Sequence, residues 1–195
     1  MTSYDPRGPG SRPYEMWNAY TGPGLNTVEK QLYDASHDVT KVVNFNPNVP
    51  MGGTDQLFIL PQKSDKQWRS ARLEGKDSHA CPDGKKMLME AKIRLGTASK
   101  DKQVGVWPAF WAIGESQRKG VEWPACGEWD IMETTDGQGI SLGTLWYGIK
   151  DSSGAMGQHT LQTGENHFDY TEYHKWGIMV DRTSSNWRDQ SVTCE

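Results

Sequence analysis

Glycine and proline interrupt this sequence at short intervals along its whole length. The 195 residues include 21 glycines and 10 prolines, and apolar stretches lie between them, such as Leu57–Leu60 between Gly52-Gly53 and Pro61. Frequent glycine and proline break helices and favour short strands joined by turns. The sequence therefore predicts an all-β fold of mostly antiparallel strands, arranged as a sandwich rather than a closed barrel.

Three further apolar stretches add detail to this prediction. Residues 104–113 (VGVWPAFWAI) are apolar at nearly every position, which is typical of a central strand covered on both faces. In residues 175–181 every second side chain is apolar, the pattern of a half-buried strand. Residues 87–95 consist of good helix formers but also alternate, and because their neighbours are strand-like we predict a strand there.

Length and charge limit the class of protein. A chain of 195 residues has the length of one domain, and we expect a loose arm at 1–14 followed by a single sandwich domain at 15–195. The net charge is −4, and no basic run favours nucleic acid or an anionic membrane as a partner. The mean hydropathy is −0.76, and no apolar run approaches the roughly 20 residues of a membrane helix.

The three cysteines, Cys81, Cys126 and Cys194, include no closely spaced pair, so a structural zinc site is not expected. They are interpreted either as buried apolar side chains or, for Cys81 and Cys126, as a disulfide. The N-terminus lacks the apolar core of a secretory signal, and no Asn-x-Ser/Thr acceptor is present. These features do not indicate a compartment.

The most informative stretch is the acidic segment 128–133 (EWDIME). In a regular strand Glu128 and Asp130 share one face, and strict alternation would place Glu133 on the opposite, apolar face. Burying a lone carboxylate there would cost several kcal/mol. A one-residue β-bulge at Ile131–Met132 removes this conflict, because it returns Glu133 to the face of the other two acids.

With this bulge, the Cα atoms of the two glutamates lie about 13–15 Å apart along the strand. On a concave sheet their carboxyl groups can approach to about 5–6 Å, close to the separation in retaining glycosidases. Such crowding separates the two pKa values, so that one carboxyl ionises as a nucleophile and the other keeps a proton to donate. The alternative interpretation is an acidic solvent-exposed face of an edge strand.

Three motifs around this segment strongly resemble glycoside hydrolase family 16: residues 105–114 (GVWPAFWAIG), 123–134 (WPACGEWDIMET) and 143–148 (GTLWYG). The family includes laminarinase-like and mixed-linkage endo-β-glucanases, with relatives that act on galactans. The resemblance extends from about Trp17 to Thr193 through residues 21–33, 67–75 and 174–182. It implies a concanavalin-like jelly roll of two antiparallel sheets, with the substrate bound across the concave one.

The resemblance also implies roles for individual residues. Glu128 would be the nucleophile, Asp130 its electrostatic helper and Glu133 the general acid/base. Four residues are expected to bind sugar. Trp123 precedes the acidic strand, and Arg72 is a strand arginine that binds hydroxyl groups. Trp107 and Trp111 would supply two further indole surfaces. For Trp107 and Trp111, ordinary core packing is the alternative.

Three positions depart from the family pattern. Trp146 stands where the family often has a histidine near the acid/base, so tuning by an imidazole would be lost. Trp129 replaces a branched aliphatic residue and must pack on the opposite sheet. The family continues beyond the Val-Thr of the last strand, whereas this sequence stops at Glu195. We therefore expect a domain that lacks its last strands, which would leave sheet edges unpaired.

The predicted function is that of a retaining endo-glycosidase that hydrolyses β-1,3 or mixed β-1,3/1,4 glucans by double displacement. The alternatives are a non-catalytic carbohydrate-binding or inactive truncated relative, a β-1,3-galactan hydrolase, and an esterase built on the Gly-x-Ser-x-Gly motif around Ser141. No redox cofactor or metal is indicated, although some family members hold a structural calcium ion. A polysaccharide is the expected partner of a monomer, and the family resemblance implies an extracellular location.

Overall fold

The computed structural model describes residues 17–26, 28–35, 39–44, 55–63, 67–149, 157–162 and 167–194. Within these ranges the regular structure is β-strand, together with three short 3-10 helices at Lys100–Lys102, Glu115–Lys119 and Trp187–Asp189. The predicted all-β class is thus confirmed. The arm predicted at residues 1–14 lies outside the described residues, and the single domain predicted at 15–195 stays a prediction.

The chain forms two compact units, Met1–Ser78 and His79–Glu195, which are described separately. In the first unit, short strands form two two-stranded sheets, β1–β8 and β4–β5, and a four-stranded sheet in the order β2-β3-β7-β6. The pair β3–β7 is parallel, and the other pairs are antiparallel. The strands are β1 (Trp17–Ala19), β2 (Gly22–Pro23), β3 (Leu32–Tyr33), β4 (Thr40–Asn44), β5 (Asp55–Ile59), β6 (Gln62–Lys63), β7 (Trp68–Ser70) and β8 (Leu73–Gly75).

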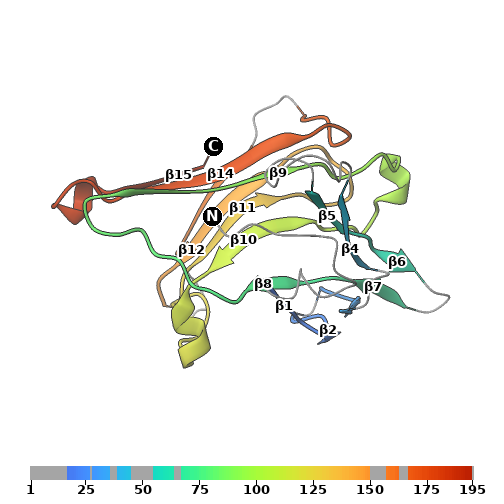
Figure 1. Ribbon diagram of the computed structural model, residues 1–195, viewed down its shortest axis with the longest axis horizontal. Coiled ribbons are helices and arrows are strands. Elements are labelled where there is room, and N and C mark those ends of the chain that lie inside the picture. Colours follow the sequence, from blue (N-terminus) through green and yellow to red (C-terminus); the bar gives the residue numbers. More distant parts are fainter. Residues whose placement is uncertain are drawn as a thin grey trace. The chain divides into compact units, whose positions relative to one another are not determined.

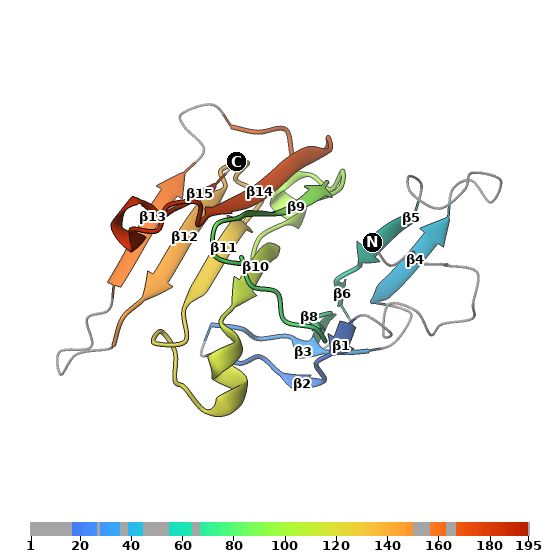
Figure 2. The ribbon, with the colours of Figure 1, turned by 60° about the vertical axis from the view of Figure 1, so that its left-hand side comes forward.

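The second unit contains two antiparallel sheets (Figure 1). One has the order β10-β11-β12-β13, with its strands side by side in Figure 2, and the other has the order β15-β14-β9. Strands β11 and β14 contact each other between the sheets, and their buried side chains, including Ile131, Met132, Ile178 and Val180, form the core. The strands are β9 (Lys86–Ile93), β10 (Ala109–Ile113), β11 (Glu128–Glu133), β12 (Leu142–Tyr147), β13 (Gly157–Gln162), β14 (His174–Asp181) and β15 (Ser191–Cys194).

Strand β9 resolves the helix-or-strand ambiguity of residues 87–95 in favour of the predicted strand. Exposed and half-buried side chains alternate along its whole length. It pairs with β14 over eight positions, from Lys86 opposite Asp181 to Ile93 opposite His174. Periodicity of two therefore dominates the helix propensity of the individual residues, because the neighbouring strand offers a pleated apolar surface.

The prediction of a central strand over residues 104–113 is wrong in its first half. Strand β10 begins only at Ala109, and among the described residues it pairs only with β11. Gly105 adopts a left-handed φ of 79° within a turn closed by the Val106 N–H and the Gln103 carbonyl, 2.9 Å apart. That conformation cannot continue a strand, and Val104 is 70% exposed.

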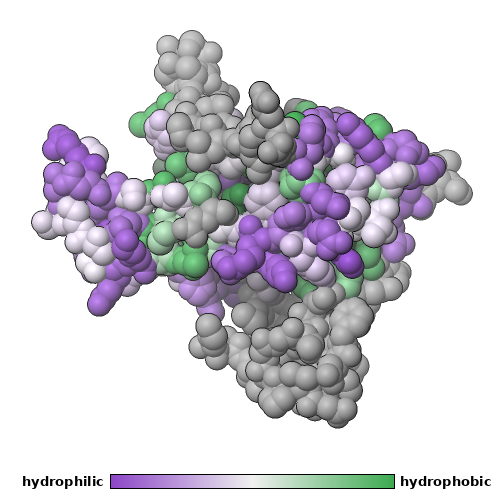
Figure 3. Space-filling view, turned by 90° about the horizontal axis from the view of Figure 1, so that it is seen from above, coloured by the Kyte–Doolittle hydropathy of each residue, from purple (hydrophilic) through white to green (hydrophobic). Residues whose placement is uncertain are grey.

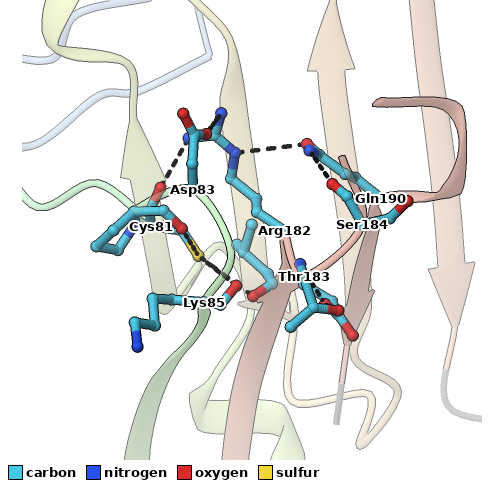
Figure 4. Close-up of polar contacts among 10 residues, drawn as sticks. Cys81, Asp83, Lys85, Arg182, Thr183, Ser184 and Gln190 are labelled. Atoms are coloured by element: carbon cyan, nitrogen blue, oxygen red, sulfur yellow. Dashed lines mark hydrogen bonds and ion pairs between the residues drawn. The ribbon is translucent and has the colours of Figure 1, made fainter. Parts of the chain in front are cut away.

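The three cysteines are free, and Cys81 and Cys126 are buried. This agrees with the interpretation as apolar side chains and contradicts the Cys81–Cys126 disulfide. Cys81 lies in a loop that Arg182, directly after β14, holds in place (Figure 4). The Arg182 guanidinium forms an ion pair with Asp83 and donates to the Cys81 carbonyl at 2.8 Å and to Gln190 Oε1 at 3.4 Å.

The outward positions of β9 and β14 include charged side chains, joined by ion pairs between Lys86 and Asp181 and between Lys175 and Glu90. Among the coloured residues on the face shown in Figure 3, hydrophilic ones predominate and hydrophobic ones lie in small groups. In the described part of the chain, no helix has the length and apolar character needed to cross a membrane.

The core between β11 and β14 makes a prediction about stability. Ile178→Ala empties a fully buried position and should lower the free energy of unfolding by about 2–5 kcal/mol. Leu88→Ala, on the neighbouring strand β9 but 52% exposed, is the control and should change it by about 0.5 kcal/mol or less. Urea unfolding measures both, and equal losses would contradict this assignment of the core.

Candidate active site

Strand β11 contains the predicted β-bulge. On β10, Phe110 pairs with Met132 and Trp111 pairs with Asp130, so Ile131 is the extra residue. The register with β12 shifts in the same interval. Ile131 and Met132 are both buried, with 3% and 2% of their surface exposed. Two successive side chains thus enter the core, and Glu133 returns to the face of Asp130 as the sequence predicted.

The start of β11 depends on a close approach of two backbone segments. The Gly114 N–H, directly after β10, donates to the Gly127 carbonyl at 2.9 Å. A Cβ atom at Gly114 would lie 1.8 Å from the Cys126 carbonyl oxygen, a distance that no side chain permits. Glycine at 114 therefore allows Glu128 to begin the strand opposite Ile113.

The bulge brings three carboxyl groups into contact. Asp130 makes side-chain hydrogen bonds with both Glu128 and Glu133. Two carboxyl groups can hydrogen-bond only when one of them carries a proton, so these contacts favour protonation within the group. Because both glutamates reach the same carboxyl, their nearest oxygens are at most about 8 Å apart.

Two indole N–H groups donate to these acids. Trp107 Nε1 lies 3.0 Å from Glu133 Oε1, and Trp146 Nε1 lies 2.8 Å from Asp130 Oδ2. An indole nitrogen donates and cannot accept, so both contacts favour the ionised form of the carboxyl that receives them. Trp146 thus supplies a hydrogen-bond donor at the position where the sequence analysis expected tuning by an imidazole to be lost.

Burial and mutual repulsion act in the opposite direction. Desolvation, reinforced by the charge and hydrogen bond of Asp130, raises the pKa of Glu133 to about 7, although the Trp107 donor opposes the shift. Desolvation also raises the pKa of Asp130, against the hydrogen bonds from Trp146, Glu128 and Glu133. Glu133 consequently retains its proton up to about pH 7 and can donate it.

Trp111, Trp146 and Trp123 lie beside the acids, as does Trp107, whereas Trp129 points to the opposite face of β11. Trp111 is directly opposite Asp130 on β10 and Trp146 directly opposite Glu128 on β12, so these side chains share the face of the acids. Trp123 contacts Trp146 with ring centroids 5.3 Å apart, and 38% of its surface is exposed. Trp129 is half-buried and paired with Ala112 and Leu145. The structure therefore brings the predicted Trp107, Trp111 and Trp123 together with Glu128, Asp130 and Glu133.

Arg72, the remaining predicted sugar-binding residue, belongs to the first of the two units. There its Nε donates to Glu74 at 2.9 Å and its carbonyl accepts from the Tyr20 N–H. Its expected role toward a sugar stays a prediction.

Trp146 is the residue that the sequence analysis noted but did not assign to the site. The available indication was its position in the GTLWYG strand, at a place associated with the acid/base in the resembled family. A donor role requires the register of β12 against β11, which one sequence does not provide.

Two alternatives find no support in the described residues. Ser141 is buried and directly precedes strand β12, whereas the nucleophile of a hydrolase elbow lies exposed between a strand and a helix. The described residues contain no group of three or more His, Cys, Asp or Glu side chains arranged to hold a metal ion. No ligands can accordingly be assigned to the calcium ion that the family resemblance allows.

Comparison with known proteins gives structural neighbours only. No protein-family model matches the sequence, and no curated protein does. An endo-1,3-beta-glucanase from Streptomyces sioyaensis is 22% identical with a TM-score of 0.73 and is matched over 93% of this chain. A family 16 enzyme of a Bacteroides ovatus mixed-linkage glucan system, solved with a G4G4G3G product, is 22% identical with a TM-score of 0.63 over 99% of this chain.

The laminarinase catalytic domain of Thermotoga maritima is 20% identical with a TM-score of 0.56 over 97% of this chain. The match covers 66% of the Streptomyces enzyme, 73% of the Bacteroides enzyme and 68% of the Thermotoga domain. At these identities the likeness shows the fold, a jelly roll of antiparallel sheets.

The raised pKa of Glu133 predicts a pH-dependent stability. The folded chain binds this proton more tightly than the unfolded chain, so the Glu133 contribution to the free energy of unfolding falls as pH rises from 4.5 to about 7. Glu133→Gln removes this titration. The free energy of unfolding of Glu133→Gln minus that of wild type should therefore be more positive at pH 7.5 than at pH 5, as measured by urea unfolding. Glu172→Gln, at an exposed position, is the control. An equal effect of Glu133→Gln at both pH values would contradict the assignment.

Proposed function

We propose that this chain is a retaining endo-glycosidase of the family 16 type that hydrolyses β-1,3 or mixed β-1,3/1,4 glucans. One observation carries the proposal: the bulged strand β11 gathers Glu128, Asp130 and Glu133 on one face, with the pKa of Glu133 raised to about 7. Glycoside hydrolysis by two carboxyl groups requires one of them to be protonated and the other ionised at the same pH.

In the first step, the Glu128 carboxylate attacks the anomeric carbon while the glycosidic bond breaks. Glu133 gives its proton to the departing oxygen, so the leaving sugar departs as a neutral alcohol. The product is a glycosyl ester of Glu128, and Glu133 is now ionised. In the second step, Glu133 takes a proton from water, the oxygen of that water attacks the anomeric carbon, and the ester bond to Glu128 breaks. Two inversions leave the configuration retained.

Asp130 regulates the charge of the nucleophile. It is hydrogen-bonded to Glu128, so a proton taken up by one of these two carboxyls changes the charge that the other carries. The Trp146 donor limits the rise in the pKa of Asp130 by stabilising its ionised form.

The surrounding indoles support a carbohydrate as the substrate. Trp107 and Trp123 are 47% and 38% exposed beside the acids, and flat aromatic faces pack well against the apolar faces of sugar rings. The neighbours act on the glucans that their names state, and one of them was solved with a glucan product. For this chain, cleavage within a glucan chain is part of the proposal, and β-1,3-galactan is the competing substrate.

A substrate panel tests the function directly. Wild type should release reducing ends from laminarin or lichenan rather than from β-1,3-galactan, and proton NMR should show the β-anomer as the first product. Glu128→Gln should lose at least about 10³-fold of this activity, because the nucleophile is removed. Glu172→Gln is the matched control and should retain it. A folded wild type that binds these glucans without cleaving them would contradict the proposal and favour a carbohydrate-binding protein.

A substrate with a dinitrophenyl leaving group separates the roles of the two glutamates. This leaving group needs no proton, so the first step no longer depends on a general acid. Glu133→Gln should therefore keep the rapid burst of dinitrophenolate release, whereas Glu128→Gln should lose it. Stopped-flow absorbance measures the burst, and the reverse pattern would contradict the assignment of nucleophile and acid.

A further inference from the structure

The indole of Trp107 is held at Glu133 although burial does not fix it. It donates to Glu133 Oε1 at 3.0 Å, but 47% of the residue is exposed. An exposed side chain exchanges rotamers freely unless its backbone or a partner restrains it. The orientation of this donor therefore depends on the segment that carries it, residues 103–108, which precedes strand β10.

That segment is attached to the turn that follows β11. Asp136 contacts it twice: its Oδ1 accepts from the Gly105 N–H at 2.7 Å, and its own N–H donates to the Val106 carbonyl at 3.1 Å. The two bonds hold consecutive residues directly before Trp107. A weaker contact, from the Thr134 N–H to the Pro108 carbonyl at 3.4 Å, lies on the other side of the tryptophan.

Packing supports the same attachment. Gly137 lies against Gln103, and a Cβ atom at 137 would be 3.0 Å from the Gln103 side chain. Gln103 is buried, and its Nε2 donates to the Ala98 carbonyl at 2.6 Å. The first residue of the segment is thus fixed on both sides, and the segment has little freedom to move away from the turn.

The backbone of Asp136 is unusual in a way that suits this role. Its φ is 56°, in the left-handed region that Asp, Asn and Gly adopt more readily than other residues. This conformation allows one residue to present both its side-chain oxygen and its N–H to the same neighbouring segment. Asp136 also lies three residues after Glu133, so a single turn connects Glu133 to the residue that holds the Trp107 segment.

We propose that Asp136 is a positioning residue, which holds residues 105–107 so that the Trp107 indole N–H stays directed at the Glu133 carboxyl. Its importance for catalysis rests on the proposed function. The coupling of Asp136 to Glu133 through Trp107 is independent of that function. The titratable groups that face Glu133 are Asp130 and, through it, Glu128 on β11. Its paired neighbours are Ala109 on β10 and Leu142 on β12, which carry no charge.

Two substitutions of Asp136 distinguish the effect of its Oδ1 acceptor from the effects of its left-handed backbone and its charge. Asp136→Gly removes Oδ1 while glycine accepts the left-handed φ. Asp136→Asn keeps both an Oδ1 acceptor and this φ, but without a charge. The probe is the Trp107 Nε1–H signal in ¹H–¹⁵N NMR spectra, assigned by its loss in Trp107→Phe and recorded as a function of pH without substrate.

In wild type this signal should follow the titration of Glu133 with a midpoint at about 7. In Asp136→Gly the signal should lose this dependence, and the Glu133 carboxyl, followed by ¹³C NMR, should titrate at higher pH because the Trp107 donor lowers its pKa. With glucan, kcat/KM should fall about tenfold, the effect of one lost hydrogen bond to a charged group. Asp136→Asn should behave as wild type.

An unchanged Trp107 signal in Asp136→Gly would overturn the proposal, and so would an Asp136→Asn variant that behaves like Asp136→Gly, because the acceptor would then not be the cause. If Asp136→Gly does not fold, hydrogen exchange of wild type provides the test. The Gly105 amide should be protected, and exchange at the rate of a free amide would refute the contact. A wild type with the expected NMR behaviour but no cleavage of any glucan would refute the proposed function and support the positioning role.

Discussion

The single extra residue at Ile131 is the constraint on which the site depends. A regular strand would direct Glu133 into the apolar core, where an unpaired carboxylate has a large desolvation cost. The bulge instead sends both Ile131 and Met132 inward, so the sheet loses regular pairing at one position but gains two buried apolar side chains. The same shift places a third carboxyl beside Asp130. Fold stability and the gathering of the acids thus have one origin.

Opposing effects then decide where the protons lie. Burial and the neighbouring negative charge raise the pKa of Glu133, while the Trp107 donor limits the rise. At Asp130, burial opposes the Trp146 donor and the hydrogen bonds from the two glutamates. Neither indole can accept or release a proton at these pH values, so both act only by stabilising charge. A histidine at position 146 would add a further titrating group, whereas a tryptophan confines proton exchange to the three carboxyls.

Local pattern was enough to predict the fold class from the frequent glycine and proline, strand β9 from its alternation and its strand-like neighbours, and the bulge from the cost of a buried carboxylate. It failed at Val104–Pro108, where apolar residues form a loop: Gly105 has a left-handed φ, and the loop is held by Asp136, which is 31 residues away. The donor role of Trp146 was equally beyond reach, because it depends on the register of β12 against β11. Apolar composition does not distinguish a buried strand from a loop whose apolar side chains are partly exposed.

The measurement that tests the account most directly is the ¹³C NMR titration of the Glu133 carboxyl in wild type and in Asp130→Asn. We expect a midpoint of about 7 in wild type and a lower one in Asp130→Asn, because the charge of Asp130 contributes to the shift. A midpoint at the ordinary 4.5 in wild type would mean that Glu133 is solvated and apart from Asp130. In that case the bulge would not gather the three acids, and the proposed chemistry would have no basis.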